Sequence, residues 1–166
     1  MLISRDRVVA VGMGGLVVSR NADQVLAAYG LGSCVGLAGW DPVARVGGLA
    51  HVVLPDSAAN RESQSPGRFA DTAVPALLDA MTRQGADIGR LVLKMAGGAQ
   101  VLALGGQNGG LAIGERNVAA VRQTLRQLGL PLAAEDTGGN SGRTLLLQVG
   151  TGRVTVQIVG RPARDL

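Results

Sequence analysis

The chain has 166 residues, 46% of them hydrophobic and 17% charged, which excludes a disordered protein and suggests one domain over residues 1–166. No apolar run approaches the roughly 18 residues that a membrane helix needs, and charges interrupt the stretch where an export signal would be apolar. We therefore expect a cytoplasmic protein without membrane insertion. With one cysteine and one histidine, we expect no internal disulfide, no metal site and no cofactor.

The net charge is +4, and arginine supplies nearly all of the positive charge. The arginines are spread along the chain, whereas nucleic-acid-binding proteins more often gather them on one face. The three aromatic residues are too few for typical base-stacking surfaces. We therefore expect no nucleic-acid partner, although an acidic protein partner stays open, because arginine suits carboxylate recognition.

Short apolar runs punctuated by glycine clusters predict strands along most of the chain. These strands are expected over residues 8–11, 16–19, 25–28, 35–40, 48–53, 91–94, 132–134, 144–149 and 154–159.

Apolar residues at spacings of three and four predict two helices, over about residues 70–84 and 115–128. Helices and strands are mixed, and several strands are joined by short turns. The expected fold is therefore α/β (α+β), a sandwich of mixed β-sheets flanked by two main helices.

The chain's only cysteine, Cys34, and its only histidine, His51, lie on two strand-like runs joined by a turn that begins at Asp41-Pro42. In the expected hairpin Asp41 faces Ala44 or Arg45. The same register brings Cys34 opposite His51 or its immediate neighbour. Opposed side chains of an antiparallel pair lie about 5 Å apart at Cβ, so the pattern predicts a Cys–His contact.

Such a contact suits nucleophilic catalysis, because a neighbouring imidazolium lowers the pKa of a thiol. The preceding loop, with Gly32 and Ser33, could present backbone N–H groups to a developing oxyanion. The alternative is structural, since lone cysteines and histidines are most often ordinary core residues.

Several blocks in order resemble the chemoreceptor glutamine deamidases of the CheD family. The resemblance lies in Gly30-Leu31-Gly32-Ser33-Cys34-Val35, Trp40-Asp41-Pro42, Gly48-Leu49-Ala50-His51, Leu54-Pro55, Gly67-Arg68-Phe69-Ala70-Asp71, Lys94-Met95-Ala96-Gly97-Gly98-Ala99, Ile113-Gly114-Glu115-Arg116-Asn117 and Asp136-Thr137-Gly138-Gly139 with Gly142-Arg143.

The resemblance implies that Cys34 is the nucleophile and His51 the general acid/base in converting receptor glutamines to glutamates through a thioester. It implies bacterial chemoreceptor cytoplasmic domains as partners, together with a phosphatase of the chemotaxis response regulator. The family usually has a threonine five or six residues before the cysteine to orient the histidine, where this chain has Tyr29 and Ala28. A catalytically weak adaptor that binds receptor and phosphatase is therefore the alternative function.

The remaining blocks have two interpretations each. Gly97, Gly98, Gly138, Gly139 and Arg143 could line the substrate site, or the glycines could simply form turns and the arginine could pair inside the fold. At the start of the second helix, Arg116 is expected to pair internally and Asn117 to bond neighbouring backbone. The glycine-rich stretch 105–110 is expected to be a flexible surface loop.

Overall fold

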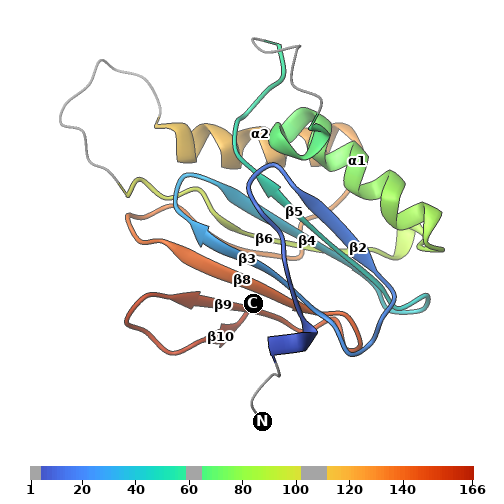
Figure 1. Cartoon of the computed structure of the whole chain (residues 1–166). Coiled ribbons are helices and arrows are strands. Elements are labelled where there is room, and N and C mark those ends of the chain that lie inside the picture. The colour runs from blue at the N-terminus through green and yellow to red at the C-terminus, as the bar shows by residue number, and fades with distance from the viewer. Residues whose placement is uncertain (1–4, 59–64, 102–111) are drawn as a thin grey trace.

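Two five-stranded β-sheets face one another in the computed structural model, which describes residues 5–58, 65–101 and 112–166 (Figure 1). The first sheet has the order β1 (Val8–Ala10), β3 (Val25–Leu31), β8 (Arg143–Gln148), β9 (Val154–Ile158) and β10 (Arg164–Asp165). The second has the order β2 (Leu16–Ser19), β5 (Val46–Val52), β4 (Val35–Asp41), β6 (Val92–Gly97) and β7 (Ala134–Thr137). Both sheets are mixed, because β1 runs parallel to β3 and β6 runs parallel to β7.

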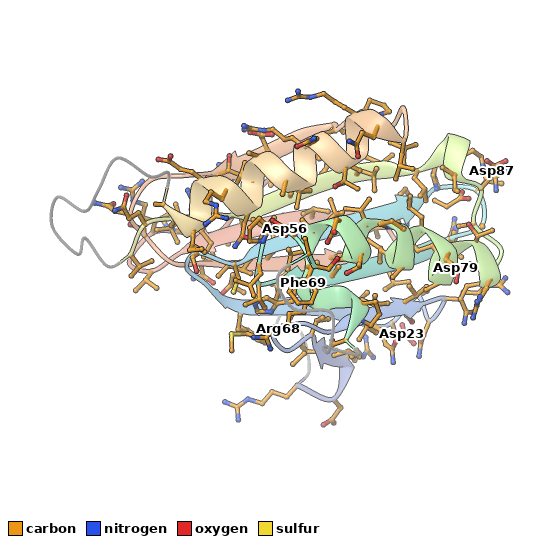
Figure 2. All side chains as sticks on the ribbon, turned by 90° about the horizontal axis from the view of Figure 1, so that it is seen from above. Asp23, Asp56, Arg68, Phe69, Asp79 and Asp87 are labelled. Carbon is orange, nitrogen blue, oxygen red and sulfur yellow. The ribbon has the colours of Figure 1, made fainter. Side chains whose placement is uncertain are left out.

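Helices α1 (Ala70–Arg83) and α2 (Ile113–Gln127) cover the outer face of the second sheet (Figure 2). Each helix buries an apolar stripe at helical spacing, as in Val74, Leu77, Leu78 and Met81 of α1. Short 3-10 turns lie at Arg5–Arg7, Pro66–Arg68 and Ile88–Arg90. The layers are therefore helices, second sheet and first sheet, which confirms the expected α+β sandwich. Among the described residues, no helix is both long enough and apolar enough to span a membrane.

The core lies in two apolar layers, one on each face of the second sheet. Alternate residues of β4 contribute to the two layers, since Leu37 packs toward the helices and Ala38 toward the first sheet. Glycine lets the layers come close. A Cβ at Gly36 would lie 2.9 Å from Leu145, and one at Gly48 would lie 2.8 Å from Leu77. The glycine clusters therefore serve close packing as well as turns.

The nine strands expected from sequence are all present; β2 has the expected ends, and the other eight are shifted at one end or both. At β7 both ends shift, from 132–134 to Ala134–Thr137. The short edge strand β10 was not predicted, because two exposed residues carry no apolar pattern. The stretch 105–110 lies outside the described residues.

The predicted register of the β4–β5 hairpin is wrong by one or two residues. Asp41 pairs with Val46, so four residues form the connection instead of two or three. Arg45 adopts a positive φ of 54° there, and its N–H donates to the Asp41 carbonyl at 2.8 Å. Such a conformation is uncommon for a residue other than glycine, and the composition of the turn does not announce it.

The buried carboxylate of Asp41 holds this connection together. It accepts hydrogen bonds from the N–H groups of Val43 at 2.8 Å, Ala44 at 3.1 Å and Asp87 at 2.8 Å. The Arg90 guanidinium lies 2.9 Å away and, together with these N–H groups, holds the pKa of Asp41 well below its usual range. Asp41 therefore ties the hairpin to the segment that precedes β6.

We expect Asp41→Asn to lower the free energy of unfolding by about 2 kcal/mol near neutral pH, because the amide turns two donors toward backbone N–H groups and loses the charge. A lowered pKa contributes stability above the ordinary carboxyl pKa of about 4, and this contribution is lost as the pH falls below it. The difference between the proteins should therefore shrink at about pH 3 in urea unfolding.

Asp79→Asn is the matched control, because Asp79 forms an exposed pair with Arg83 on α1. We expect it to change the unfolding free energy by less than about 0.5 kcal/mol. Equal effects of the two substitutions, or a difference independent of pH, would contradict the role given to Asp41.

Candidate active site

The hairpin places Cys34 and His51 on the same face of the second sheet. His51 pairs directly with Gly36, and the register continued past the Val35–Val52 pair sets Cys34 opposite Val53. Cys34 packs in the apolar layer between the sheets with Ala38 and Leu49. The two side chains are thus diagonal neighbours, a relation that puts Cβ atoms about 7–8 Å apart in a regular ladder. Within the described residues, no hydrogen bond joins Cys34 to Nε2 of His51. The two residues share one face of the sheet, but they are not the direct cross-strand pair that the sequence predicted.

A backbone carbonyl orients His51. Its Nδ1 lies 2.9 Å from the carbonyl oxygen of Val11, which follows β1. Val11 is held in turn, because its N–H donates to the Ala27 carbonyl of β3 at 2.7 Å. This carbonyl supplies the orienting acceptor for which the sequence offered only Ala28 and Tyr29. Ala28 is fully buried in β3, whereas Tyr29 is 53% exposed.

The turn after Val11 also fixes the main chain of His51. The N–H of Gly14 donates to the His51 carbonyl, and the N–H of His51 donates to the Gly15 carbonyl, each at 2.9 Å. The Gly14 carbonyl accepts from the Ser65 hydroxyl at 2.6 Å. The segment that crosses from the first sheet to the second, drawn in dark blue in Figure 1, therefore anchors both the ring and the backbone of the histidine.

The Val11 contact determines the tautomer of His51. A carbonyl oxygen can only accept, so the proton of the neutral ring must be on Nδ1. Nε2 then carries the lone pair. Nε2 is buried and has no hydrogen-bond partner among the described residues. The Nδ1 contact thus makes Nε2 the acceptor nitrogen of the neutral ring.

Burial raises the pKa of the Cys34 thiol, which is 7% exposed. This differs from the sequence expectation of a pKa lowered by a neighbouring imidazolium. The apolar residues of the first sheet that cover this face desolvate a thiolate more than a thiol. The resting form of Cys34 is therefore the neutral thiol.

The loop before Cys34 is held by backbone hydrogen bonds. The Gly32 N–H donates to the Gly30 carbonyl at 2.9 Å, so that group is engaged inside the loop. The Ala99 N–H donates to the Gly32 carbonyl and the Gly98 N–H to the Cys34 carbonyl, each at 2.8 Å. Within the described residues, the N–H groups of Ser33 and Cys34 have no acceptor.

The glycines of the predicted substrate lining gather at one end of β6 and β7. A Cβ at Gly97 would lie 2.2 Å from the Cys34 carbonyl oxygen, so glycine is needed there for the backbones to meet. A Cβ at Gly98 would lie 2.2 Å from Val118 of α2. The Gly138 N–H donates to the Gly97 carbonyl at 3.0 Å, and the Gly139 carbonyl accepts from Gln100 at 2.9 Å. Gly97 and Gly98 thus lie directly against the segment at Cys34, and Gly138 and Gly139 bond in turn to Gly97 and Gln100.

Arg143 and Arg116 differ in their surroundings. Arg143 is buried and pairs with Asp136 at 3.1 Å, which is the internal pairing that the sequence left open. Arg116 is exposed and forms no ion pair within the described part of the chain, so its expected internal pairing is wrong. Contact of Arg143 or of the four glycines with substrate stays a prediction.

Two functional features were missed from sequence. A carbonyl such as that of Val11 leaves no side-chain signature. Asn117 was expected to bond neighbouring backbone, but its amide reaches Ser33 and Val53, which are distant in the chain.

Nowhere in residues 5–58, 65–101 and 112–166 do three His, Cys, Asp or Glu side chains gather as they would around a metal ion.

Comparison with known proteins places the chain in a family. Residues 53–158 match the family model described as CheD chemotactic sensory transduction. Relatives described as probable chemoreceptor glutamine deamidase CheD are 52% identical in Symbiobacterium thermophilum, over 99% of this chain and all of the relative, and 46% identical in Moorella thermoacetica, over 98% and 97%. A relative of the same description in Caldanaerobacter subterraneus is 41% identical over 93% of this chain and 95% of its own length. The chain belongs to the CheD family.

Proposed function

We propose that this chain is a cysteine-dependent glutamine deamidase of bacterial chemoreceptors. The description of its relatives as probable chemoreceptor glutamine deamidases supports the substrate and the net reaction. One observation carries the chemistry. Cys34 shares a sheet face with a histidine whose Nδ1 is bound by Val11, which leaves Nε2 as the nitrogen that exchanges protons. This is the nucleophile, base and orienting group of a covalent hydrolase.

The first chemical step makes a thioester. As Cys34 Sγ attacks the side-chain amide carbon of a receptor glutamine, the thiol proton moves to Nε2 of His51. The new S–C bond turns the carbonyl oxygen into an oxyanion. The imidazolium then returns the proton to the amide nitrogen, the C–N bond breaks and ammonia leaves. Because burial favours the neutral thiol, proton transfer accompanies attack instead of preceding it.

The second step releases glutamate. A water molecule attacks the thioester carbon while Nε2 of His51 takes its proton. The C–S bond breaks, and the sulfur recovers the proton from the imidazolium. Val11 stabilises this sequence, because its carbonyl accepts the Nδ1 hydrogen in every state and attracts the positive ring.

The N–H groups of Ser33 and Cys34 are the donors we assign to the oxyanion. They lie in the segment that leads from β3 to β4, residues 30–34, which we call the nucleophile loop. Neither N–H has an acceptor among the described residues, whereas the N–H of Gly32 is engaged by Gly30. Backbone donors aimed at a developing charge are typical of acyl-transfer sites. In this assignment Gly32 shapes the loop, and Gly138 and Gly139 border the bound receptor segment.

Two further expectations concern the location of the protein in the cell and its second partner. Receptor cytoplasmic domains as substrate imply a cytoplasmic enzyme. A response-regulator phosphatase is the second proposed partner.

The adaptor alternative depended on a histidine without an orienting group, and the Val11 carbonyl removes that premise. An adaptor would bind the receptor domain but leave its glutamines unchanged.

Mass spectrometry of a receptor cytoplasmic domain incubated with this protein tests the proposal directly. We expect selected glutamines to gain the mass that replaces an amide NH2 with OH. Both Cys34→Ala and His51→Ala should abolish the gain, because one removes the nucleophile and the other the base. Ser19→Ala, distant from the Cys34–His51 pair along β2, is the control and should deamidate normally.

Binding distinguishes the two functions in the same samples. If the receptor domain binds the wild-type chain but its glutamines stay unchanged, the result would contradict the deamidase function and support the adaptor function. Deamidation that survives in Cys34→Ala would contradict a cysteine nucleophile.

The thiol's raised pKa predicts the pH dependence of alkylation. We expect the rate of iodoacetamide reaction with Cys34 to rise with pH and to reach half of its maximum above the ordinary thiol pKa of about 8.5. The chain in denaturant should titrate at the ordinary value, which makes it the internal control. A midpoint below that value in the folded protein would indicate a preformed thiolate and would contradict the neutral resting thiol.

A further inference from the structure

The strands β4 and β5 separate at the open end of the hairpin, where the nucleophile loop leads into β4. Val35 and Val52 form the last pair of the ladder at this end. Beyond it, the N–H groups of Val53 and Leu54 both donate to the Arg68 carbonyl, at 2.9 and 3.0 Å, so β5 leaves its partner. The Ser33 and Val53 carbonyls therefore need a donor from elsewhere.

Asn117 of α2 supplies that donor. Its Nδ2 lies 2.9 Å from the Ser33 carbonyl oxygen and 2.9 Å from the Val53 carbonyl oxygen. Only an NH2 group can donate to both, which settles which end of the amide faces them. The two acceptors come one residue before Cys34 and two residues after His51. We call Asn117 with its two carbonyl partners, Ser33 and Val53, the amide clamp.

The clamp is placed rigidly. Asn117 is fully buried one turn into α2. A Cβ at Gly114 would lie 2.5 Å from the carbonyl oxygens of Gly98 and Ala99, so the start of α2 lies directly on the segment after β6. That segment donates to the carbonyls of Gly32 and Cys34. The Gly97-Gly98 block and the Ile113-Gly114-Glu115-Arg116-Asn117 block thus act together on the nucleophile loop.

The oxygen of the same amide makes no hydrogen bond within the described part of the chain. Asn117 Oδ1 is buried and has no partner among the described residues. An unpaired buried oxygen costs stability, so an asparagine kept here for packing alone would be a poor choice. Its two amide hydrogens are what the site uses.

We propose that Asn117 is a positioning residue, which sets the distance between Cys34 and His51 by bridging the Ser33 and Val53 carbonyls. It touches no reacting atom. It acts by holding the end of the nucleophile strand against the end of the histidine strand where no ladder hydrogen bond does so. The inference rests on the proposed deamidase function.

The test compares Asn117→Ala with Val121→Ala in the full chain. Val121 lies one turn further along α2, is fully buried and packs in the helix-side core, so its truncation loosens the same helix without touching the clamp. With a receptor cytoplasmic domain as substrate, we expect Asn117→Ala to lower kcat at least about tenfold and to leave KM within about twofold, because misplacement of reacting groups costs rate more than binding. Val121→Ala should keep kcat within about twofold.

Alkylation of Cys34 is a second readout, in which the rate is expected to rise in Asn117→Ala whereas kcat falls. Releasing the loop exposes the buried thiol, so iodoacetamide should react with Cys34 at least about threefold faster in Asn117→Ala than in wild type or Val121→Ala. Unfolding followed by circular dichroism compares the free energy of unfolding of Asn117→Ala with that of Val121→Ala. Should Asn117→Ala not fold, Asn117→Ser keeps one hydroxyl donor and should show an intermediate loss of kcat.

Three results would overturn the positioning role. These are equal losses of kcat in the Asn117 and Val121 variants, a wild-type kcat in Asn117→Ala, and unchanged alkylation in that variant. An inactive wild-type chain would instead overturn the proposed function. The alkylation comparison would then decide the clamp alone.

Discussion

The hydrogen bond between His51 Nδ1 and the Val11 carbonyl determines what the histidine can do. It exists because the chain crosses from β1 in the first sheet to β2 in the second at the level of His51. The parallel β1–β3 pairing and the bond from Val11 N–H to Ala27 hold the carbonyl in place. The packing of the two sheets therefore holds the imidazole in place, since separating the sheets would free the ring to rotate.

Close backbone approach is the second constraint around Cys34. Gly97 brings β6 against the Cys34 carbonyl, and Gly114 brings α2 against the same strand end, at distances that no side chain would allow. From there Asn117 reaches both halves of the hairpin. The cysteine thus sits in a rigid and desolvated place. The same burial raises the pKa of the thiol, so the resting group is an ordered neutral thiol instead of a reactive thiolate.

The sequence predicted the layers and the Cys34–His51 neighbourhood because both follow from strong local patterns: apolar periodicity and a turn beginning at Asp-Pro. The register was missed because a positive φ at Arg45 lengthens the connection without any glycine to mark it. The direction of the thiol pKa was missed because the desolvating residues belong to the other sheet. The partners of Asn117 lie 84 and 64 positions away, which no local rule reaches.

The tautomer of His51 tests the central claim most directly. The chain has one histidine, so a long-range proton–nitrogen NMR spectrum of the uniformly nitrogen-15-labelled protein contains one imidazole to assign. For the neutral ring the account predicts a protonated Nδ1 and an unprotonated Nε2, because Val11 can only accept. A neutral ring protonated on Nε2, or a mixture of the two forms as in free histidine, would contradict it, because the nitrogen assigned as the base would then carry a proton.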